Sequence, residues 1–552
     1  MNIRFTTLTV FFLAGFGLLA SNMYFLQVER GDHYRQRAQA QSGAAALLAA
    51  ERGAIYFTDK NGSKIPAALN KDYSVIFVVP TEVEDVAEAV SQIKVAIPQT
   101  YTEAYTEEIY TAELTASLSK KNDQYEQLIE RATEEQVAIA READIKGLHV
   151  GTVRARYYPF GSVAAHVLGF VGESAETGAS EGQYGIEAQY NSALAGTPGR
   201  FGDGGEIVGS IPGKEISLTI DHNIQSQAEK ILNKLATDYS AIGGSIIVQD
   251  PRTGAILAMA SYPTFDPNNY SESNLKDFIN PTLQEVYEPG SISKVVTMVA
   301  GIDTGAITPS TTYYDSGSLT LDGRTIKNWD LKARGTLTMT EVLEYSVNTG
   351  AAFAEQKTGH KAFYDYLLKF GFKDLTGISL PGETAGRLTP LERYPRDINF
   401  ATASYGHGIS VTPLRLITII SAIANKGVMN QPTITADTPS FEAERIMSES
   451  TAEAVTGMMI SAVDKAKVAA IPRYTVAGKT GTAFVPDFED GGYTDDVINT
   501  YVGFAPATNP RFTILVKLDK PAGAPLAGQT VVPAFAEIAR YALTSYNVPP
   551  DR

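Results

Sequence analysis

The sequence predicts an α+β protein, with a strand-rich N-terminal region and a C-terminal domain that combines a sheet with helices. A buried strand pattern over 244–250 runs into a turn at 251–254, and 255–260 is typical of its hairpin partner. Strand patterns return near 474–484 and 499–518, after a long stretch in which helical segments dominate. Segregated runs of strands and helices are typical of α+β folds.

The length, charge, Cys content and His spacing of the chain exclude several classes of function. The chain has 552 residues, enough for two or three domains, and a formal charge of −16. An acidic surface argues against nucleic acid or anionic lipid as the main partner, and its simplest meaning is solubility. There is no Cys, which excludes disulfides, cysteine nucleophiles and thiolate metal sites. The six His form no short ligand spacing, so we expect neither a metal site nor a cofactor.

The N-terminus carries an uncharged apolar stretch from Phe5 to Val28. A membrane span needs roughly 20 apolar residues, whereas the apolar part of a cleaved signal peptide has about 7–15. We therefore expect a transmembrane helix at 5–28, with residues 1–4 as a short cytoplasmic head and the rest outside the cytoplasm. A cleaved signal peptide is the alternative, although Leu19-Ala20-Ser21 is a poor cleavage site. Basic residues flank the stretch on both sides, so charge does not fix its orientation.

Local patterns divide the rest of the chain, with a domain boundary near residue 240. The expectations before that boundary are a helical stalk at 29–50, short strands and hairpins at 52–80, an acidic region at 82–146 with helical periodicity in pieces such as Tyr125 to Ile145, Gly-rich strands at 151–220 and a helix over 221–239.

Ser291 and Lys294 form the first candidate catalytic pair. Pro289-Gly290 is a turn signal, and the apolar run 295–300 predicts a buried helix directly after it. Positions i and i+3 share a helix face, so the two side chains can meet. A serine hydroxyl becomes a nucleophile when a base takes its proton, and a lysine is such a base only when burial or a cationic neighbour keeps it neutral.

S-x-x-K alone is a weak signal, because the sequence contains it three times. The other copies, Ser117–Lys120 and Ser273–Lys276, lie in polar segments without the Pro-Gly turn and the apolar helix. The usual meaning of such a copy is a solvated surface pair, and we assign both to that.

Two further motifs strengthen the case. Ser346-Val347-Asn348 offers a hydroxyl and a carboxamide, and Lys479-Thr480-Gly481-Thr482 lies in a strand pattern where Gly481 lets a substrate backbone approach. A second S-x-N, Ser545-Tyr546-Asn547, follows the third motif and has the wrong order. A second K-T-G, Lys357-Thr358-Gly359, is expected to be a helix end with Gly as the C-cap.

The order S-x-x-K, S-x-N, K-T-G is typical of serine β-lactamases and penicillin-binding proteins. Over nearly its whole length the chain resembles a class B, monofunctional penicillin-binding protein. The resemblance implies an antiparallel sheet flanked by helices at 240–552, on an elongated pedestal domain of the dimerisation type at 51–235. The matching segments are Arg52-Gly53-Ala54-Ile55, Asp59-Lys60-Asn61-Gly62, Arg156-Tyr157-Tyr158-Pro159, Leu168-Gly169-Phe170-Val171-Gly172, Gly185-Ile186-Glu187, Asp250-Pro251-Arg252-Thr253-Gly254, Gly406-His407-Gly408 with Thr412-Pro413, and Gly503-Phe504-Ala505-Pro506.

The resemblance also implies a mechanism, peptidoglycan D,D-transpeptidation through an acyl-enzyme that β-lactams trap. Lys294 would take the proton of Ser291, and Ser346 would relay protons between Lys294 and Lys479. Backbone amides of Ser291 and Thr482 would form the oxyanion hole. The residues implied to bind the donor stem peptide are Asn348, Thr480, Gly481 and Thr482. Strict strand alternation puts Lys479 and Thr480 on opposite faces, which a bulge or an edge position would resolve.

Several alternatives stay open at this point. A β-lactamase or a D,D-carboxypeptidase shares the motifs, and a cell-wall scaffold with a decayed site is a non-enzymatic alternative. Segments such as 380–383 and 405–408 favour the cell-division branch over the elongation branch. Relatives in that role work beside a membrane glycan polymerase, so the resemblance implies such a partner, with other divisome proteins.

Overall fold

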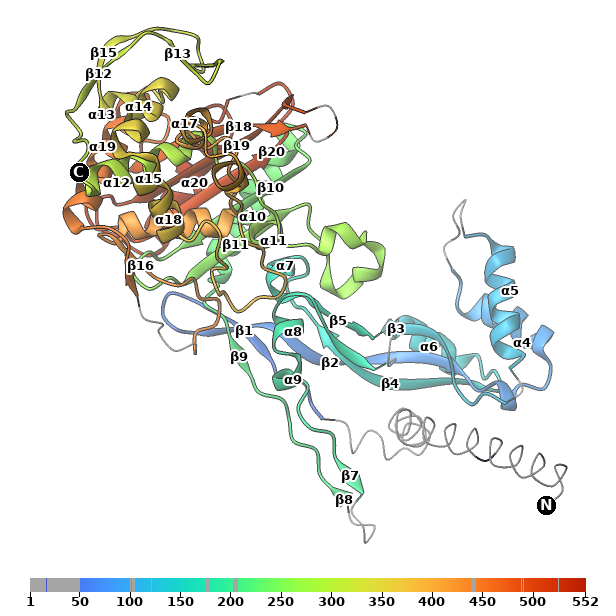
Figure 1. Ribbon diagram of the computed structural model, residues 1–552. Helices are drawn as coiled ribbons and strands as arrows, with labels where there is room; N and C mark the ends of the chain where they lie inside the picture. Colours follow the sequence, from blue (N-terminus) through green and yellow to red (C-terminus); the bar gives the residue numbers. More distant parts are fainter. Residues whose placement is uncertain are drawn as a thin grey trace, which may run out of the picture. The chain divides into compact units, whose positions relative to one another are not determined.

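The structure is a computed structural model (Figure 1). It describes residue 16 and residues 50–99, 101, 105–120, 122–174, 179–201, 207–437, 443–487, 489, 491–524 and 526–552. The predicted span at 5–28, apart from Phe16, and the predicted stalk, apart from Ala50, lie outside these residues. Among the residues that are described, no helix combines the length and apolar character that a bilayer crossing requires.

Backbone contacts divide the chain into two compact units. One unit is residues 1–67 together with 159–552, and the other is residues 68–158. The units meet at residues 67–68 and 158–159, and not near residue 240. The expected bounds of the pedestal and the catalytic domain therefore stay predictions. The smaller unit contains much of the acidic region, and the larger contains all three sequence motifs.

The smaller unit is a three-stranded antiparallel sheet with helices. The long strand β2 (Lys64–Val78) pairs in this unit with β3 (Glu126–Ala132) and β4 (Leu148–Tyr157). Helical periodicity over 125–145 is therefore wrong for its first half, which is β3. The helix begins only after Thr133, whose side chain forms a capping box with Gln136 and so fixes the start of α6. The helices are α4 (Val86–Ala96), α5 (Glu107–Leu118) and α6 (Glu134–Glu142), with a 3-10 turn η2 (Pro80–Glu82).

The N-terminal part of the larger unit consists of short elements joined by a buried ion pair. The guanidinium of Arg52 lies 2.6 Å from the fully buried carboxylate of Glu187 and donates to Asn191 Oδ1 at 2.8 Å. This pairing ties the start of the described chain to two helices far along the sequence. The elements are β1 (Ile55–Thr58), α7 (Ala165–Leu168), β5 (Phe170–Glu173), β6 (Ser180–Gln183), α8 (Gly185–Gln189), α9 (Asn191–Leu194), β7 (Arg200–Phe201), β8 (Ile207–Val208) and β9 (Ile216–Ser217).

A five-stranded antiparallel sheet forms the centre of the larger unit, as the sequence predicts. Its strand order is β11-β10-β20-β19-β18, so the strand that carries the K-T-G motif lies at one edge. The strands are β10 (Gly243–Gln249), β11 (Ile256–Tyr262), β18 (Ala477–Pro486), β19 (Tyr493–Ala505) and β20 (Phe512–Asp519). The predicted hairpin of 244–260 and both later strand regions are confirmed.

Helices cover both faces of this sheet (Figure 1). The helices α10 (His222–Asp238) and α20 (Val531–Ser545) bury their apolar side chains against one face. Asp221 caps α10 by accepting from the backbone of residues 223 and 224, which confirms the predicted helix. On the other face the fully buried α18 (Pro413–Ala424) packs against β10, β19 and β20.

The S-x-x-K and S-x-N motifs lie in a helical layer that also contains small strand pairs. The sequence did not predict these strands, although Asp322-Gly323 is a two-residue hairpin signal. The remaining helices are α11 (Pro281–Gln284), α12 (Ser293–Asp303), α13 (Met339–Glu344), α14 (Asn348–Thr358), α15 (His360–Lys369), α16 (Thr389–Arg393), α17 (Asp397–Ala403) and α19 (Glu449–Ala466), with 3-10 turns η3 (Pro267–Glu272), η4 (Leu275–Phe278) and η5 (Gly290–Ile292). The strands are β12 (Thr312–Asp315), β13 (Ser318–Leu321), β14 (Arg324–Lys327), β15 (Gly335–Thr338), β16 (Val428–Met429) and β17 (Glu444–Arg445).

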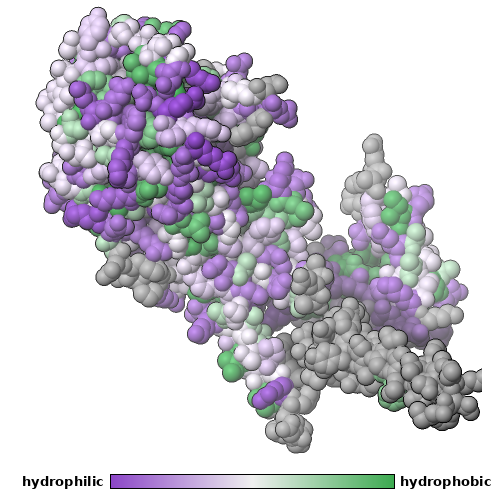
Figure 2. Space-filling view, in the orientation of Figure 1, coloured by the Kyte–Doolittle hydropathy of each residue, from purple (hydrophilic) through white to green (hydrophobic). Residues whose placement is uncertain are grey.

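The visible surface of the larger unit is mostly hydrophilic, with small separate hydrophobic patches (Figure 2). This agrees with the formal charge of −16, which keeps a protein soluble by mutual repulsion.

Candidate active site

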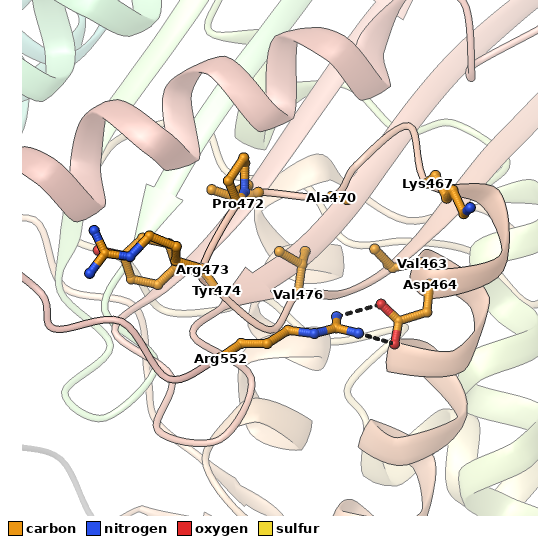
Figure 3. Close-up of a pocket in the computed structure, with 10 residues that line it drawn as sticks. Val463, Asp464, Lys467, Ala470, Pro472, Arg473, Tyr474, Val476 and Arg552 are labelled. Carbon is orange, nitrogen blue, oxygen red and sulfur yellow. Dashed lines mark hydrogen bonds and ion pairs between the residues drawn. The ribbon is translucent and has the colours of Figure 1, made fainter.

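A hollow of about 410 Å³ lies at the C-terminal end of α19 (Figure 3). Arg552 crosses it to pair with Asp464, with a shortest nitrogen–oxygen distance of 2.6 Å. None of the residues that line this hollow belongs to the three sequence motifs. The motif residues meet elsewhere, between α12, α14 and β18.

The turn before α12 holds Ser291 against the edge strand. Gly290 has φ +53°, and a Cβ there would lie 3.0 Å from the carbonyl oxygen of Thr482. A Cβ on Gly481 would likewise lie 2.7 Å from the carbonyl oxygen of Pro289. Glycine at both positions lets the two backbones approach, and Ser291 follows in η5 with Lys294 one turn later. Ser291 Oγ lies 2.8 Å from Lys294 Nζ, so the expected i, i+3 contact is present.

Lys294 is fully buried and its amine is surrounded by neutral oxygens. Besides Ser291 Oγ, Nζ lies 2.8 Å from the carbonyl oxygen of Ser346, 3.1 Å from Ser346 Oγ and 2.8 Å from Asn348 Oδ1. Burial lowers the pKa of the Lys294 ammonium well below its usual value, and the nearby Lys479 lowers it further. A lysine in this environment is available as a base.

The S-x-N motif is a strained turn that enters α14. Ser346 has φ +56°, an uncommon left-handed conformation for a serine, and Val347 is fully buried at the N-cap. The amide Nδ2 of Asn348 donates to the carbonyl oxygen of Lys327 at 2.9 Å, which leaves Oδ1 facing Lys294. The turn therefore presents three oxygens to one lysine.

Lys479 approaches the same turn from β18. Its Nζ lies 3.0 Å from Ser346 Oγ, so this hydroxyl is hydrogen-bonded to both lysines. Burial lowers the pKa of Lys479 to about 7. Nζ also lies 3.2 Å from both Oγ1 and the carbonyl oxygen of Thr480. The pairing of β18 with β19 is regular from 477 to 484, so no bulge brings Lys479 and Thr480 to the same face. The long side chain of Lys479 instead reaches Thr480 around the edge of the sheet.

The side chain of Thr482 lies on the face of β18 opposite Lys479, because strand residues alternate. Its Oγ1 lies 3.2 Å from Asn499 Oδ1 and accepts from the backbone N–H of Ala527 at 3.4 Å. Asn499 is fully buried and donates in turn to Ala524 and Thr530. The sequence analysis missed Asn499, whose only signal is its position opposite Thr482 in the strand register.

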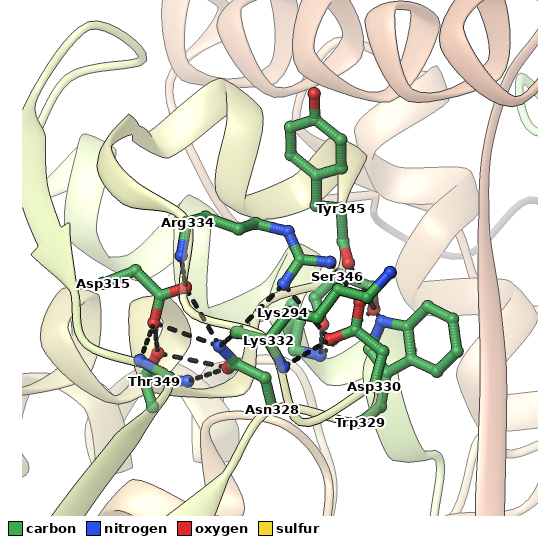
Figure 4. Close-up of polar contacts among 11 residues, drawn as sticks. Lys294, Asp315, Asn328, Trp329, Asp330, Lys332, Arg334, Tyr345, Ser346 and Thr349 are labelled. Atoms are coloured by element: carbon green, nitrogen blue, oxygen red, sulfur yellow. Dashed lines mark hydrogen bonds and ion pairs between the residues drawn. The ribbon is translucent and has the colours of Figure 1, made fainter.

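A buried carboxylate, also missed, stands behind the S-x-N turn (Figure 4). Asp315 is fully buried and accepts from Thr349 Oγ1 at 2.8 Å and from Asn328 Nδ2 at 3.0 Å. Its Oδ2 also accepts from the backbone N–H of Arg334. The loop that these bonds hold carries Trp329, whose Nε1 donates to the carbonyl oxygen of residue 345. Asp315 thus fixes both the loop and the start of α14.

The repeated motifs stay apart from this assembly. Ser117–Lys120 ends α5 in the smaller unit, and Ser273–Lys276 follows the 3-10 turn η3 and runs into η4. Gly359, in the second K-T-G, has φ +85° and caps α14 as predicted. The structure brings together Ser291, Lys294, Ser346, Asn348 and Lys479, with Thr480 beside Lys479.

Comparisons with known proteins identify the family. The family model of the penicillin binding protein transpeptidase domain matches residues 244–540, more than half of the chain. The chain belongs to the class B penicillin-binding proteins. A second family model, the penicillin-binding protein dimerisation domain, matches residues 47–202.

Curated relatives of this penicillin-binding protein align over most of their own length. It is 31% identical to penicillin-binding protein PbpB of Mycobacterium tuberculosis over 578 residues, which cover 96% of this chain and 83% of the relative. It is 30% identical to stage V sporulation protein D of Bacillus subtilis, over 91% of this chain and 79% of the relative. It is 29% identical to peptidoglycan D,D-transpeptidase FtsI of Escherichia coli, over 99% of this chain and 92% of the relative.

Solved structures show the same fold. The crystal structure of penicillin binding protein 3 from Mycobacterium tuberculosis complexed with aztreonam matches with a TM-score of 0.69 and 27% identity. The match covers 92% of this chain and 98% of that chain. The complex of that protein with ampicillin matches with the same TM-score and identity. The expected transpeptidase fold behind an N-terminal dimerisation domain is therefore confirmed.

Proposed function

We propose that this penicillin-binding protein cross-links peptidoglycan stem peptides through an acyl-enzyme on Ser291, and that β-lactams inhibit it by acylating the same serine. D,D-transpeptidation is the activity in the names of its relatives. The observation that carries the assignment of Ser291 is its 2.8 Å contact with a fully buried lysine of lowered pKa.

The hydrogen bonds around Lys294 suit the neutral amine. The carbonyl oxygen of Ser346 and Oδ1 of Asn348 are acceptors only, and each lies 2.8 Å from Nζ. A neutral amine has two N–H groups for these oxygens and one lone pair. The lone pair then accepts the proton of Ser291 Oγ, also at 2.8 Å, as the oxygen attacks.

In the first half-reaction Ser291 Oγ attacks the carbonyl carbon of the penultimate D-alanine. The bond from that carbon to the nitrogen of the terminal D-alanine breaks, and an ester remains on the serine. The hydroxyl of Ser346, bonded to Lys294 and Lys479, relays the proton to the departing nitrogen. The acyl group then passes from Ser291 Oγ to an amine of a second stem peptide, which forms the cross-linking amide.

Donor binding falls to the edge strand and the S-x-N turn. The edge strand β18 can pair with an extended peptide. The space beside Gly481 is taken by the carbonyl oxygen of Pro289, so this glycine serves the approach of the nucleophile turn and not, as the sequence predicts, that of a substrate backbone. Asn348 binds the amide groups of the donor. Thr480 and Thr482 share one face of β18 and hold the terminal carboxylate, together with the ammonium of Lys479, which reaches Thr480 from the other face. The backbone amides of Ser291 and Thr482, which the close approach of Gly290 to β18 brings together, bind the oxyanion.

Incubation of purified protein with a fluorescent penicillin, followed by peptide mass mapping, tests the nucleophile. We expect a stable adduct on Ser291 and none in Ser291→Ala. Ser293→Ala is the matched control, because Ser293 is a buried serine two residues away and should not affect labelling. An adduct on another residue, or wild-type labelling of Ser291→Ala, would refute the assignment.

The fate of the acyl group separates transpeptidation from its alternatives. A donor stem peptide offered with an acceptor amine should give a cross-linked product. Transfer to water alone would indicate a D,D-carboxypeptidase, and fast turnover of penicillin would indicate a β-lactamase.

The cellular role that we propose is septal wall synthesis, with residues 5–28 as a membrane anchor, the N-terminus in the cytoplasm and a membrane glycan polymerase as partner. The uncharged N-terminal stretch supports the anchor. The alignment with FtsI over 99% of this chain supports the role. A fluorescent fusion concentrated along the lateral wall instead of the septum would favour elongation, and a soluble full-length chain after fractionation would exclude the anchor.

A further inference from the structure

A second polar cluster lies three residues before the nucleophile. The carboxylate of Glu288 accepts from the backbone N–H of Gly408 at 2.9 Å and from the hydroxyl of Tyr493 at 3.0 Å. Three residues span at most about 10 Å, so Glu288 is tethered close to Ser291. The carboxylate thus joins the nucleophile turn to the start of β19 and to the loop after α17.

A row of aromatic rings begins at this carboxylate with Tyr493, which donates its hydroxyl to it. The ring of His407 lies 5.3 Å from that of Tyr493 and 5.2 Å from that of Tyr405. The Tyr405 ring in turn lies 6.0 Å from Lys294 Nζ. The rings therefore run from the carboxylate to the buried lysine. Tyr493 is 44% exposed, so this cluster opens to solvent, whereas Lys294 is closed off.

The neighbours of Glu288 leave its charge uncompensated. Burial raises the pKa of Glu288 to about 7. Burial and then Lys294 lower the pKa of His407 to about 4, so this ring is neutral at pH 7. Burial raises the pKa of both Tyr405 and Tyr493, which stay neutral as well. A carboxylate at the end of a row of neutral aromatic side chains is a favourable site for an organic ammonium group.

We propose that Glu288, with the rings of Tyr405, His407 and Tyr493, binds the ammonium group of the acceptor stem peptide and takes its proton. The inference rests on the proposed transpeptidase function and assigns the second half of that reaction. A proton passes from the acceptor nitrogen to the Glu288 carboxylate. The free amine then attacks the ester carbon, and a carbon–nitrogen bond forms while the bond to Ser291 Oγ breaks. Ser291 Oγ regains a proton from the attacking nitrogen through Lys294, and Glu288 releases its proton to solvent.

The chemistry of the two half-reactions explains why two proton acceptors are present. The nucleophile of the first half is a serine hydroxyl next to a buried amine. The nucleophile of the second half arrives from solvent as a cation, which a charged Lys479 would repel and a carboxylate attracts. A general base works best with a pKa near the operating pH, which fits this carboxyl.

The test compares the two halves in full-length protein. Acylation is followed with fluorescent penicillin, and acceptor use is followed as the ratio of aminolysis to hydrolysis for a D-alanyl thioester donor with D-alanine as the amine. We expect this ratio to fall by about 10²-fold in Glu288→Gln, the lower range for a lost general base, with a much smaller change in acylation. Glu285→Gln is the matched control, since Glu285 is exposed and should leave both quantities unchanged.

The pH dependence gives a readout that a structural role would not move. The ratio should rise as pH passes about 7, because the base acts when deprotonated. The midpoint should stay in place when amines of different pKa are used as acceptors. It should move to higher pH in Tyr493→Phe, because the lost hydroxyl had lowered the pKa of Glu288. If Glu288→Gln fails to fold, Glu288→Asp takes its place. This variant keeps a carboxylate and should keep the rise of the ratio with pH.

Three results would overturn the proposal. An unchanged ratio in Glu288→Gln would exclude an acceptor role, and an equal loss of acylation and aminolysis would make Glu288 a support of the nucleophile turn. A wild-type midpoint that follows the pKa of the added amine would also contradict it. Failure of the proposed function itself looks different, because the wild type would then show no acylation of Ser291.

Discussion

The two ends of the candidate site bury groups of opposite charge in the same way. At one end Lys294 and Lys479 contact neutral oxygens, and at the other end Glu288 contacts a backbone N–H and a phenol. Burial disfavours the charged form of each group, so it lowers the pKa of the lysines and raises that of the carboxyl. An ion pair would shift each of these pKa values the other way.

In the proposed mechanism one fold prepares a base for each half-reaction, Lys294 for the first and Glu288 for the second. Burial lowers the pKa of Lys294 well below 10.5 and raises that of Glu288 from 4.5 to about 7. The difference is access. The lysine end is closed and deprotonates a residue of the protein itself, whereas the carboxyl end opens to solvent through Tyr493 and suits a base for a molecule that arrives.

The strongest way to break the lysine end is Lys294→Met, which keeps the length of the side chain and removes the amine. We expect the rate of Ser291 acylation to fall by about 10²–10⁴-fold, the range for a lost general base. The fold should survive, since a thioether is easier to bury than an amine. Stopped-flow labelling with fluorescent penicillin measures the rate. Lys276→Met, in a repeated S-x-x-K, is the control and should label at the wild-type rate.

Lys479→Met sharpens the comparison through pH. The charge of Lys479 lowers the pKa of Lys294, so its removal should raise that pKa. Acylation needs neutral Lys294, and its rising pH limb should therefore move to higher pH. A limb that stays in place or moves down would contradict the coupling. Binding of stem peptides should weaken as well, because Lys479 is assigned to the donor carboxylate.

Asp315→Asn tests the support behind the S-x-N turn. The variant places an amide against the N–H groups that the carboxylate accepts, so we expect a loss of about 1–3 kcal/mol in the free energy of unfolding from unsatisfied donors. Trp329 is the single Trp of the chain, and its emission should report a loosened loop. Asp365→Asn, at an exposed helix pair, is the control. Unchanged stability and emission would remove Asp315 from the account.

The smallest effect is expected at the second K-T-G. Lys357→Met should leave labelling by penicillin within error, because this motif ends α14 and does not reach Ser291. A large loss of labelling would mean that the choice between the two copies is wrong.

Much of this architecture could be predicted from sequence because it depends on short patterns. The Pro-Gly turn and the apolar run of α12 predict the Ser291–Lys294 contact, and strand patterns predict β10, β11, β18, β19 and β20. Local context selected the S-x-x-K and K-T-G copies that meet in the structure, and motif order excluded the second S-x-N. The helix that begins after Asp221 and the C-cap at Gly359 also followed from local patterns.

The groups that sequence reasoning missed depend on contacts between distant segments. Asp315 meets Asn328 and Thr349 only after two hairpins fold, and Asn499 meets Thr482 only through the strand register. The local periodicity of β3 predicts a helix, but the segment forms a strand because its pairing with β2 outweighs that pattern. Glu288 belongs to the quoted motif, but the aromatic side chains near it come from the loop after α17 and from β19.

The most direct test of the central claim, that buried and uncompensated lysines prepare Ser291, is the rate of its acylation by fluorescent penicillin as a function of pH. The account predicts a rising limb with a midpoint well below 10.5, the usual lysine value, and the loss of this limb in Lys294→Met. A limb that begins only near the usual lysine value, or one that persists in Lys294→Met, would contradict it.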